Sequence, residues 1–256
     1  MITTTTIVIL CLFAFVAGFV DAIVGGGGLI QLPAGLILLP QFPAGTVIGS
    51  LKIPAFTGTA FAVQQYLKKV TVNAKQVLTM TAIAFLSAFA GSEVLLMVSN
   101  KYMNPIIFFV LVIVAIYTYS KKNFGQHTLK NIDPKKQLIY SMIISLVIGF
   151  YDGFIGPGAG SFLIMAFISI LGYDFLKAGT HAKLVNLATN LGSISLFLLK
   201  GSILWSVAIP MAASNGIGGM LGARLAIFKG NQFIRVFFLL VVIATLLRFG
   251  YDIFCR

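Results

Sequence analysis

The stretch Gly18-Phe19-Val20-Asp21-Ala22-Ile23-Val24-Gly25-Gly26-Gly27-Gly28 decides the fold class of this chain, because it recurs 131 positions later. The second copy reads Gly149-Phe150-Tyr151-Asp152-Gly153-Phe154-Ile155-Gly156-Pro157-Gly158-Ala159, and Gly160 extends its glycine-rich run. Each copy places a carboxylate and a helix-breaking run inside a segment that is otherwise apolar. Ionisable groups at membrane depth are costly and mark functional sites. The repetition therefore indicates a transport site built by two related halves.

The composition predicts an all-α, polytopic membrane protein. Of the 256 residues, 59% are hydrophobic and only 9% are charged, whereas soluble domains carry about 25% charged residues. The net charge of +12 resides mainly in short loops between apolar segments, which is typical of topology-setting charge and argues against a nucleic-acid partner. The expected partners are a small anionic substrate and the lipid bilayer, with the oligomeric state open.

The same composition argues against other classes of protein. The two histidines and two cysteines are not spaced for metal ligation, so no metal and no cofactor are expected. An enzyme would need a nucleophile and base, or a metal constellation, at depth, so we do not expect an enzyme. A P-loop is absent from the sequence, which excludes ATP-driven pumping by this chain alone.

Each half contains five apolar segments, and the second of each set is only about 11 residues long, half of a membrane span. Short segments that follow a glycine run at matching places in two halves are typical of a transporter site. We therefore expect one transmembrane domain, 1–256, made of repeat 1 (about 1–120), a basic linker (121–137) and repeat 2 (about 138–256). The predicted segments are 7–24, 29–39, 47–67, 77–98 and 105–119, then 138–155, 161–171, 183–199, 203–228 and 233–254.

The distribution of basic residues predicts the topology. The linker 121–137 carries five lysines and one aspartate, so we expect it to be cytoplasmic in a multi-pass protein of the inner (plasma) membrane. If all five segments of each half cross, more basic residues face the cytoplasm than if the short segments re-enter. An odd number of crossings per half inverts the second repeat, so we predict five plus five inverted helices. The alternative, eight full crossings with 29–39 and 161–171 re-entrant, stays open.

The glycine-rich runs are candidate substrate-binding elements. Unwinding a helix frees backbone N–H groups, and the helix that restarts after each run has an N-terminus that attracts anions. Glycines that only let helices approach each other are the alternative, but four in succession fit it poorly. The candidate residues are Gly25, Gly26, Gly27 and Gly28, with Gly156, Pro157, Gly158, Ala159 and Gly160 in the second copy.

Polar side chains inside the third segment of each half extend the candidate site. Lys52 and Lys183 would suit an anion, although both could also reach the interface. We expect Lys183 near the start of its helix, with His181 two residues before it. Asn186 and Asn190 lie on the same helix face as Lys183. Ala44-Gly45-Thr46 recurs as Ala178-Gly179-Thr180, an offset of 134 that pairs Lys52 with Asn186. The acids Asp21 and Asp152 fit either a proton-coupling role or the capping of N–H groups freed by the glycines.

These motifs resemble the TauE/SafE family, the sulfite exporters. The resemblance covers nearly the whole chain and is carried by 18–29, by Lys52 with Gly58-Thr59, and by Gly179-Thr180-His181-Ala182-Lys183 with Asn186 and Asn190. Pro157 in place of the first copy's Gly26, and Leu29 where the longest family versions continue the glycine run, are departures. The resemblance implies inner-membrane proteins that move sulfite, sulfoacetate and related organosulfonates.

The sequence thus predicts a secondary transporter that exports small sulfur-containing anions by alternating access, with proton coupling through Asp21 or Asp152 as a further hypothesis. The alternative is a transporter or channel for another small carboxylate or inorganic anion. The direction of transport, the coupling ion and the identity of the anion are left open by the sequence.

Overall fold

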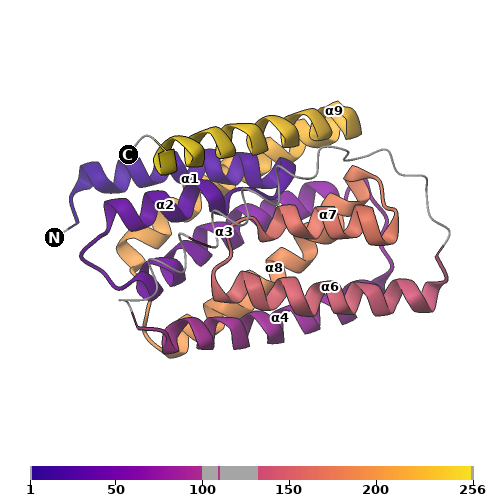
Figure 1. The fold of residues 1–256 in the computed structure, drawn as a ribbon, viewed down its shortest axis with the longest axis horizontal. Coiled ribbons are helices and arrows are strands. Elements are labelled where there is room, and N and C mark those ends of the chain that lie inside the picture. Colours follow the sequence, from indigo (N-terminus) through magenta and orange to yellow (C-terminus); the bar gives the residue numbers. More distant parts are fainter. Residues whose placement is uncertain (1, 100–108, 110–131, 255–256) are drawn as a thin grey trace.

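The computed structural model describes residues 2–99, 109 and 132–254, and the regular secondary structure of these residues is all α-helix (Figure 1). The predicted segment 105–119 and the linker up to residue 131 fall outside these residues, apart from Phe109. The helices are α1 (Thr4–Val24), α2 (Gly28–Leu38), α3 (Ala44–Tyr66), α4 (Ala74–Met97), α6 (Pro134–Phe154), α7 (Ala159–Leu171), α8 (Phe175–Leu199) and α9 (Trp205–Phe254).

Four of the described helices, α1, α4, α6 and α8, begin three to eight residues before the apolar pattern does, because a polar capping residue precedes each of them. Asn73 caps α4 by accepting a hydrogen bond from the Gln76 N–H (3.1 Å), and Asp174 caps α8 by accepting one from the Lys177 N–H (2.9 Å). The largest difference concerns α8, which begins at Phe175. Lys183 therefore lies in the interior of its helix and not at the start, as the sequence suggested.

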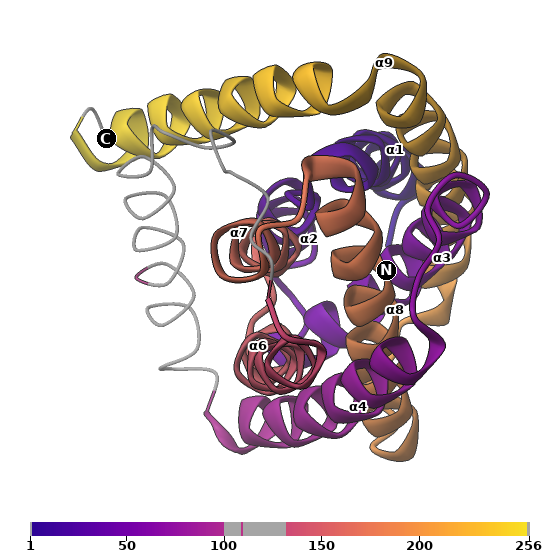
Figure 2. The ribbon, with the colours of Figure 1, turned by 90° about the vertical axis from the view of Figure 1, so that its right-hand side faces the viewer.

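The last two predicted segments, 203–228 and 233–254, form the two arms of α9. Gly230 adopts φ 72° and ψ −168°, which interrupts the helix between them. Figure 2 shows the two arms running in clearly different directions. A residue without Cβ reaches this conformation readily, so the glycine explains where the chain turns.

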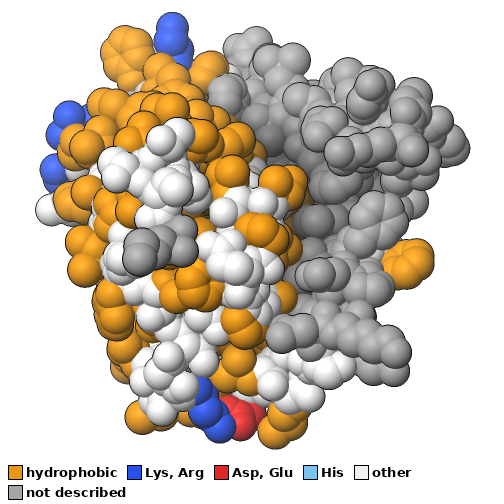
Figure 3. All heavy atoms as spheres, turned by 90° about the vertical axis from the view of Figure 1, so that its left-hand side faces the viewer, with side chains coloured by type: hydrophobic (Ala, Val, Ile, Leu, Met, Phe, Trp, Pro, Cys, Tyr) orange, Lys and Arg blue, Asp and Glu red, His pale blue; other side chains and the backbone are white. Residues whose placement is uncertain are grey.

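The described part of the chain has the dimensions of a membrane protein. Five of its helices, α1, α3, α4, α6 and α8, are long and apolar enough to cross a bilayer, while α2 and α7 have 11 and 13 residues. Figure 3 shows hydrophobic side chains spread over the described surface of one face, with charged side chains confined to its margins. Large exposed side chains such as Leu12, Leu78 and Leu86 suit a lipid environment. The fold is therefore that of a polytopic helical membrane protein.

The helices of the two halves correspond at one offset. Helices α6, α7, α8 and α9 begin within one residue of 131 positions after α1, α2, α3 and α4. The local offset of 134 expected in the third helices is not followed, because Ala44 and Phe175 both stand first in their helices. Lys52 therefore corresponds to Lys183 and not to Asn186.

Helices α3 and α8, which correspond at this offset, run in opposite directions. Residues near the helix ends belong to two apolar clusters. The first contains Tyr66 and Phe175, and the second contains Ala44 and Phe197. Since α3 begins in the second cluster and ends in the first, whereas α8 does the reverse, the two helices are antiparallel. We call the part around Tyr66 and Phe175 the basic end, because Lys68, Lys69, Lys75, Lys135, Lys136 and Lys177 belong to helix ends and turns there.

Each short helix turns back beside the helix that precedes it. A Cβ on Gly27 would collide with the Ala17 carbonyl of α1, and Leu39, just after α2, packs in the same cluster as Leu10. Likewise Leu171 of α7 shares a cluster with Ile144 of α6. The pairs α1–α2 and α6–α7 are thus hairpins whose tips lie inside the bundle.

Candidate functional site

The tips of the two hairpins touch through their backbones. The N–H of Ser161 donates to the Gly25 carbonyl (3.0 Å), and the Ser161 hydroxyl donates to the Val24 carbonyl (2.9 Å). Gly25 ends α1 with φ 77°, and a Cβ there would overlap Gly160 and Ser161. In Figures 1 and 2, α2 and α7 lie roughly end to end among the longer helices. The N-termini of two short helices therefore face a common space.

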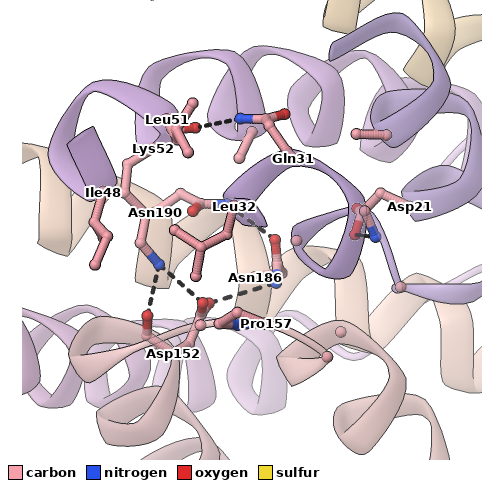
Figure 4. A pocket seen from close by; sticks show the side chains of 18 of the residues that line it. Asp21, Gln31, Leu32, Ile48, Leu51, Lys52, Asp152, Pro157, Asn186 and Asn190 are labelled. Carbon is pink, nitrogen blue, oxygen red and sulfur yellow. Dashed lines mark hydrogen bonds and ion pairs between the residues drawn. The ribbon is translucent and has the colours of Figure 1, made fainter. Parts of the chain in front are cut away.

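That space is a cavity of about 70 Å³, lined by both hairpin tips and by α3, α8 and α9 (Figure 4). Its size suits a solute of a few heavy atoms and is far below that of a drug-sized pocket. The lining consists of Ala17, Asp21, Gly25, Gly27, Gly28, Gln31, Leu32, Ile48, Leu51, Lys52, Ala55, Asp152, Ile155, Gly156, Pro157, Gly158, Gly160, Asn186, Asn190 and Asn215.

Two buried ion pairs connect the halves beside the cavity. Lys52 Nζ of α3 lies 2.9 Å from Asp152 Oδ1 and donates to the Asp152 carbonyl at 2.6 Å. Its counterpart, Lys183 Nζ of α8, lies 2.9 Å from Asp21 Oδ2 and also contacts the Asp21 carbonyl. Each lysine neutralises a carboxylate and the negative C-terminal end of a helix in the other half. Buried charges require such partners, so the pairs hold the two hairpins between α3 and α8.

The two aspartates have different surroundings. Asp152 Oδ2 accepts from Asn186 Nδ2 (3.4 Å) and from the Thr189 hydroxyl, and Asn190 Nδ2 donates onward to Asn186 Oδ1 (2.9 Å). Asp21 accepts from the Gly27 N–H (3.3 Å) in addition to Lys183. Asp21 therefore caps the freed backbone of the first break, whereas Asp152 is the acceptor on which a network of side-chain donors converges.

The charged side chains of this lining cancel. Lys52 forms an ion pair with Asp152. Asp21 is neutralised by Lys183, which does not itself line the cavity. What remains is the positive potential of the α2 and α7 N-termini, where backbone N–H groups point towards the cavity end of each helix. This favours a small anion without leaving an unpaired charge when the cavity is empty of solute.

Two polar residues of the lining, Gln31 and Asn215, are not among those predicted from the sequence. Asn215 Nδ2 of α9 donates to Gln31 Oε1 of α2 (2.8 Å), and Gln31 Nε2 donates to the Leu51 carbonyl (3.0 Å). Both amides are nearly buried. The sequence does contain a signal for both residues, because a polar amide inside an otherwise apolar segment at membrane depth is unusual.

The structure brings most of the predicted site residues together, but not all. Gly25, Gly27, Gly28, Lys52, Gly156, Pro157, Gly158, Gly160, Asn186 and Asn190 line the cavity with Asp21 and Asp152, whereas Gly26, Ala159, His181 and Lys183 do not. Lys183 lies outside the lining and contacts its residue Asp21. His181 lines a separate cavity at the basic end. The described residues contain no group of three His, Cys, Asp or Glu that could hold a metal ion.

A helical membrane bundle in which two broken helices meet at an internal polar cavity is the architecture of a membrane transporter. The chain belongs to the sulfite exporter TauE/SafE family, whose model matches residues 10–249. The protein is therefore a membrane transporter of this family and not an enzyme.

Three relatives carry consistent names. A probable membrane transporter protein, ORF9, of Sinorhizobium sp is 34% identical over 92% of this chain and 88% of its own length. A probable membrane transporter protein of Haemophilus influenzae is 33% identical over 95% and 94%. YfcA of Escherichia coli, also named a probable membrane transporter protein, is 28% identical over 98% and 92%. No solved structure matches the chain.

Proposed function

We propose that this protein is a secondary transporter that exports small sulfur-containing anions, such as sulfite or organosulfonates, by alternating access. The observation that carries the proposal is the contact between the two hairpin tips beside Lys52. A hydrated oxyanion loses its water only where fixed donors replace it, and two helix N-termini with an ammonium and several amides supply donors of that kind. The description of the family as sulfite exporters supports the choice of sulfur-containing anions.

We propose that the two repeats are inverted relative to each other, five helices plus five, with the linker 121–137 in the cytoplasm and the protein in the inner membrane. The opposite directions of α3 and α8 support the inversion. The lysines collected at the basic end support the orientation, since cytoplasmic loops carry an excess of Lys and Arg. The ion pairs Lys52–Asp152 and Lys183–Asp21 then join the repeats and must rearrange when one repeat rocks against the other.

We propose Asp152 as the group that couples transport to protons. Its carboxylate competes with an incoming anion for Lys52 and Asn186. Protonation of Asp152 would release both donors to the anion, so that binding of the anion would depend on pH. In proteoliposomes, Asp152→Asn is expected to abolish the pH dependence of uptake, while Asp21→Asn, which alters a capping group, retains it. Unchanged pH dependence in both variants would remove the coupling role.

A thermal-shift series on purified protein tests the substrate class. Sulfite, sulfate, thiosulfate, sulfoacetate, taurine and acetate are compared at matched ionic strength, since a ligand that binds the folded state raises the unfolding temperature. The proposal expects a shift selective for sulfite or a sulfonate that is lost in Lys52→Ala and kept in Lys200→Ala, whose lysine lies at the surface. A shift selective for acetate would favour a carboxylate transporter, and equal shifts with all salts would contradict a specific site.

Flux measurements separate a transporter from a channel. Alternating access requires that uptake of radiolabelled substrate into liposomes saturates with concentration, because each cycle carries a bound solute. Flux that rises linearly without saturation would contradict the transporter mechanism.

A further inference from the structure

A second cavity, of about 420 Å³, lies at the basic end, where α4, α6 and α8 begin. Lys75, Lys135, Lys177 and His181 contribute to its lining, and no residue is shared with the central cavity. We propose that this cavity is a second anion site, and that its ligand is inorganic hydrogen phosphate. The proposal goes beyond the transported substrate and would stand if the central cavity took another solute.

The charges around this cavity favour an anion. Lys75 and Lys135 are the second residues of α4 and α6, and Lys177 is the third of α8. A cation at a helix N-terminus opposes the helix dipole, so three lysines at three such ends create an unusually positive region. None of the three forms an ion pair with another described residue. An oxyanion in this cavity would be attracted by all three lysines.

The nearby carboxylates do not neutralise this region completely. Asp133 accepts from the Lys135 N–H (2.8 Å), and Asp174 accepts from the Lys177 N–H (2.9 Å), so both are engaged as helix caps. Neither aspartate lines the cavity. Three lysines therefore face two acids that are committed to backbone groups.

His181 gives the site its chemical preference. The ring is 1% exposed and packs against Phe167 and Tyr173, with ring centroids 5.8 and 4.9 Å away. His181 Nδ1 lies 2.8 Å from the Lys177 carbonyl, an acceptor, so we assign the proton of the neutral imidazole to Nδ1. Nε2 is then a hydrogen-bond acceptor, and it has no hydrogen-bond partner among the described residues.

An acceptor among lysines selects an oxyanion that carries its own proton. Inorganic phosphate retains a P–OH group at neutral pH, which can donate to His181 Nε2 while its other oxygens accept from the lysines. Sulfate has no such proton, and neither does the phosphodiester of a lipid headgroup. Gln76, which also lines the cavity, is held in a polar network in which its Nε2 donates to Tyr173 OH (3.0 Å) and to Ser141 Oγ (2.6 Å).

Binding of radiolabelled phosphate to the purified full-length chain at neutral pH, with competition by sulfate at matched ionic strength, tests this inference. The wild type is expected to prefer phosphate over sulfate by about tenfold or more, the value of one hydrogen bond to a charged ligand. K135Q/K177Q is expected to lose the binding. K68Q/K69Q removes the same charge from the same end but outside the cavity lining, and is expected to retain it.

His181→Phe keeps an aromatic ring between Phe167 and Tyr173 but removes Nε2, so the preference for phosphate is expected to fall to within about twofold. Repeating the measurement in nanodiscs with and without phosphatidylglycerol separates the two sources of phosphate, and competition by the lipid would contradict the assignment to free phosphate. Equal affinity for sulfate and phosphate in the wild type, or unchanged phosphate binding in K135Q/K177Q, would overturn the proposal. Since both lysines lie at the surface end, the double variant decides the question even if His181→Phe does not fold.

Discussion

Lys52 shows at the level of one residue why a buried charge can be structural and functional together. Its side chain is 8% exposed, and its ammonium contacts both the carboxylate and the carbonyl of Asp152. Lys52→Met would leave the Asp152 carboxylate buried without a cation, so we expect a loss of about 3–5 kcal/mol in the free energy of unfolding. Reversible unfolding in mixed micelles measures it.

A surface ion pair provides the control for Lys52. Lys200 lies 2.9 Å from Glu93, the same distance as in the buried pair, but its side chain is 48% exposed. Lys200→Met is expected to cost only about 0–1 kcal/mol. The double variant Lys52→Met/Asp152→Leu should recover much of the lost stability but not the anion binding. Equal losses for the two single variants would show that burial does not govern the strength of the pair.

The residues of the site differ in how far sequence predicts them. The glycine runs and the two aspartates could be recognised because they repeat. The apolar pattern predicts that Lys183 lies near the start of its helix, whereas Asp174 caps the helix nine residues earlier. Its place in the sequence, two residues before Lys183, predicts His181 in the central site, but in the structure it lines the cavity at the basic end. Burial and facing direction depend on tertiary packing, which no local pattern contains.

At the level of elements, the hairpin tips depend on the absence of side chains. Gly25→Ala would place a Cβ against Gly160 and Ser161 and would also force alanine to φ 77°. Strain in the left-handed region costs about 1–2 kcal/mol, and overpacking adds about 1–3 kcal/mol. We expect the hairpins to separate and transport to be lost, as measured by uptake into liposomes.

Gly201 offers a matched comparison for the backbone strain alone. It has φ 63°, but nothing lies within 4 Å of a Cβ placed there. Gly201→Ala is therefore expected to lose stability by about 1–2 kcal/mol and to keep its transport rate. If Gly25→Ala also retained normal transport, close contact of the tips would not be required for function.

The existence and order of the elements were predictable, but their boundaries and register were not. Every predicted segment in the described part corresponds to a helix or to an arm of α9, because long apolar runs leave few alternatives. The local repeat Ala-Gly-Thr suggested an offset of 134, yet the helices keep 131. The two Ala-Gly-Thr copies occupy different turns of their helices, so a short matching motif was a weaker guide than the equivalent lysines that bind equivalent aspartates.

At the scale of the whole molecule, helices of each half pack against helices of the other half. Helix α1 packs on α9, and α4 packs on α6. At these crossings Gly222 of α9 fits against the Phe19 carbonyl of α1, and Gly91 of α4 fits against the Phe150 carbonyl of α6. Small residues that allow backbones to approach closely stabilise helix association in membranes. Neither half can therefore bury its own glycine surfaces.

This packing predicts that the halves fold only together. Expressed separately, residues 1–120 and 138–256 would each expose the crossing surfaces, one unpaired lysine and one unpaired aspartate, so we expect each to be degraded or aggregated. Co-expressed, they should co-purify through a tag on one half and recover uptake in liposomes. Gly222→Leu, which blocks the α1–α9 crossing, should prevent co-purification, whereas Ile217→Leu at an exposed position of α9 should not. A single half that remained monodisperse and protease-resistant would show that the contacts between the halves are not needed for folding, and the two ion pairs would then serve transport alone.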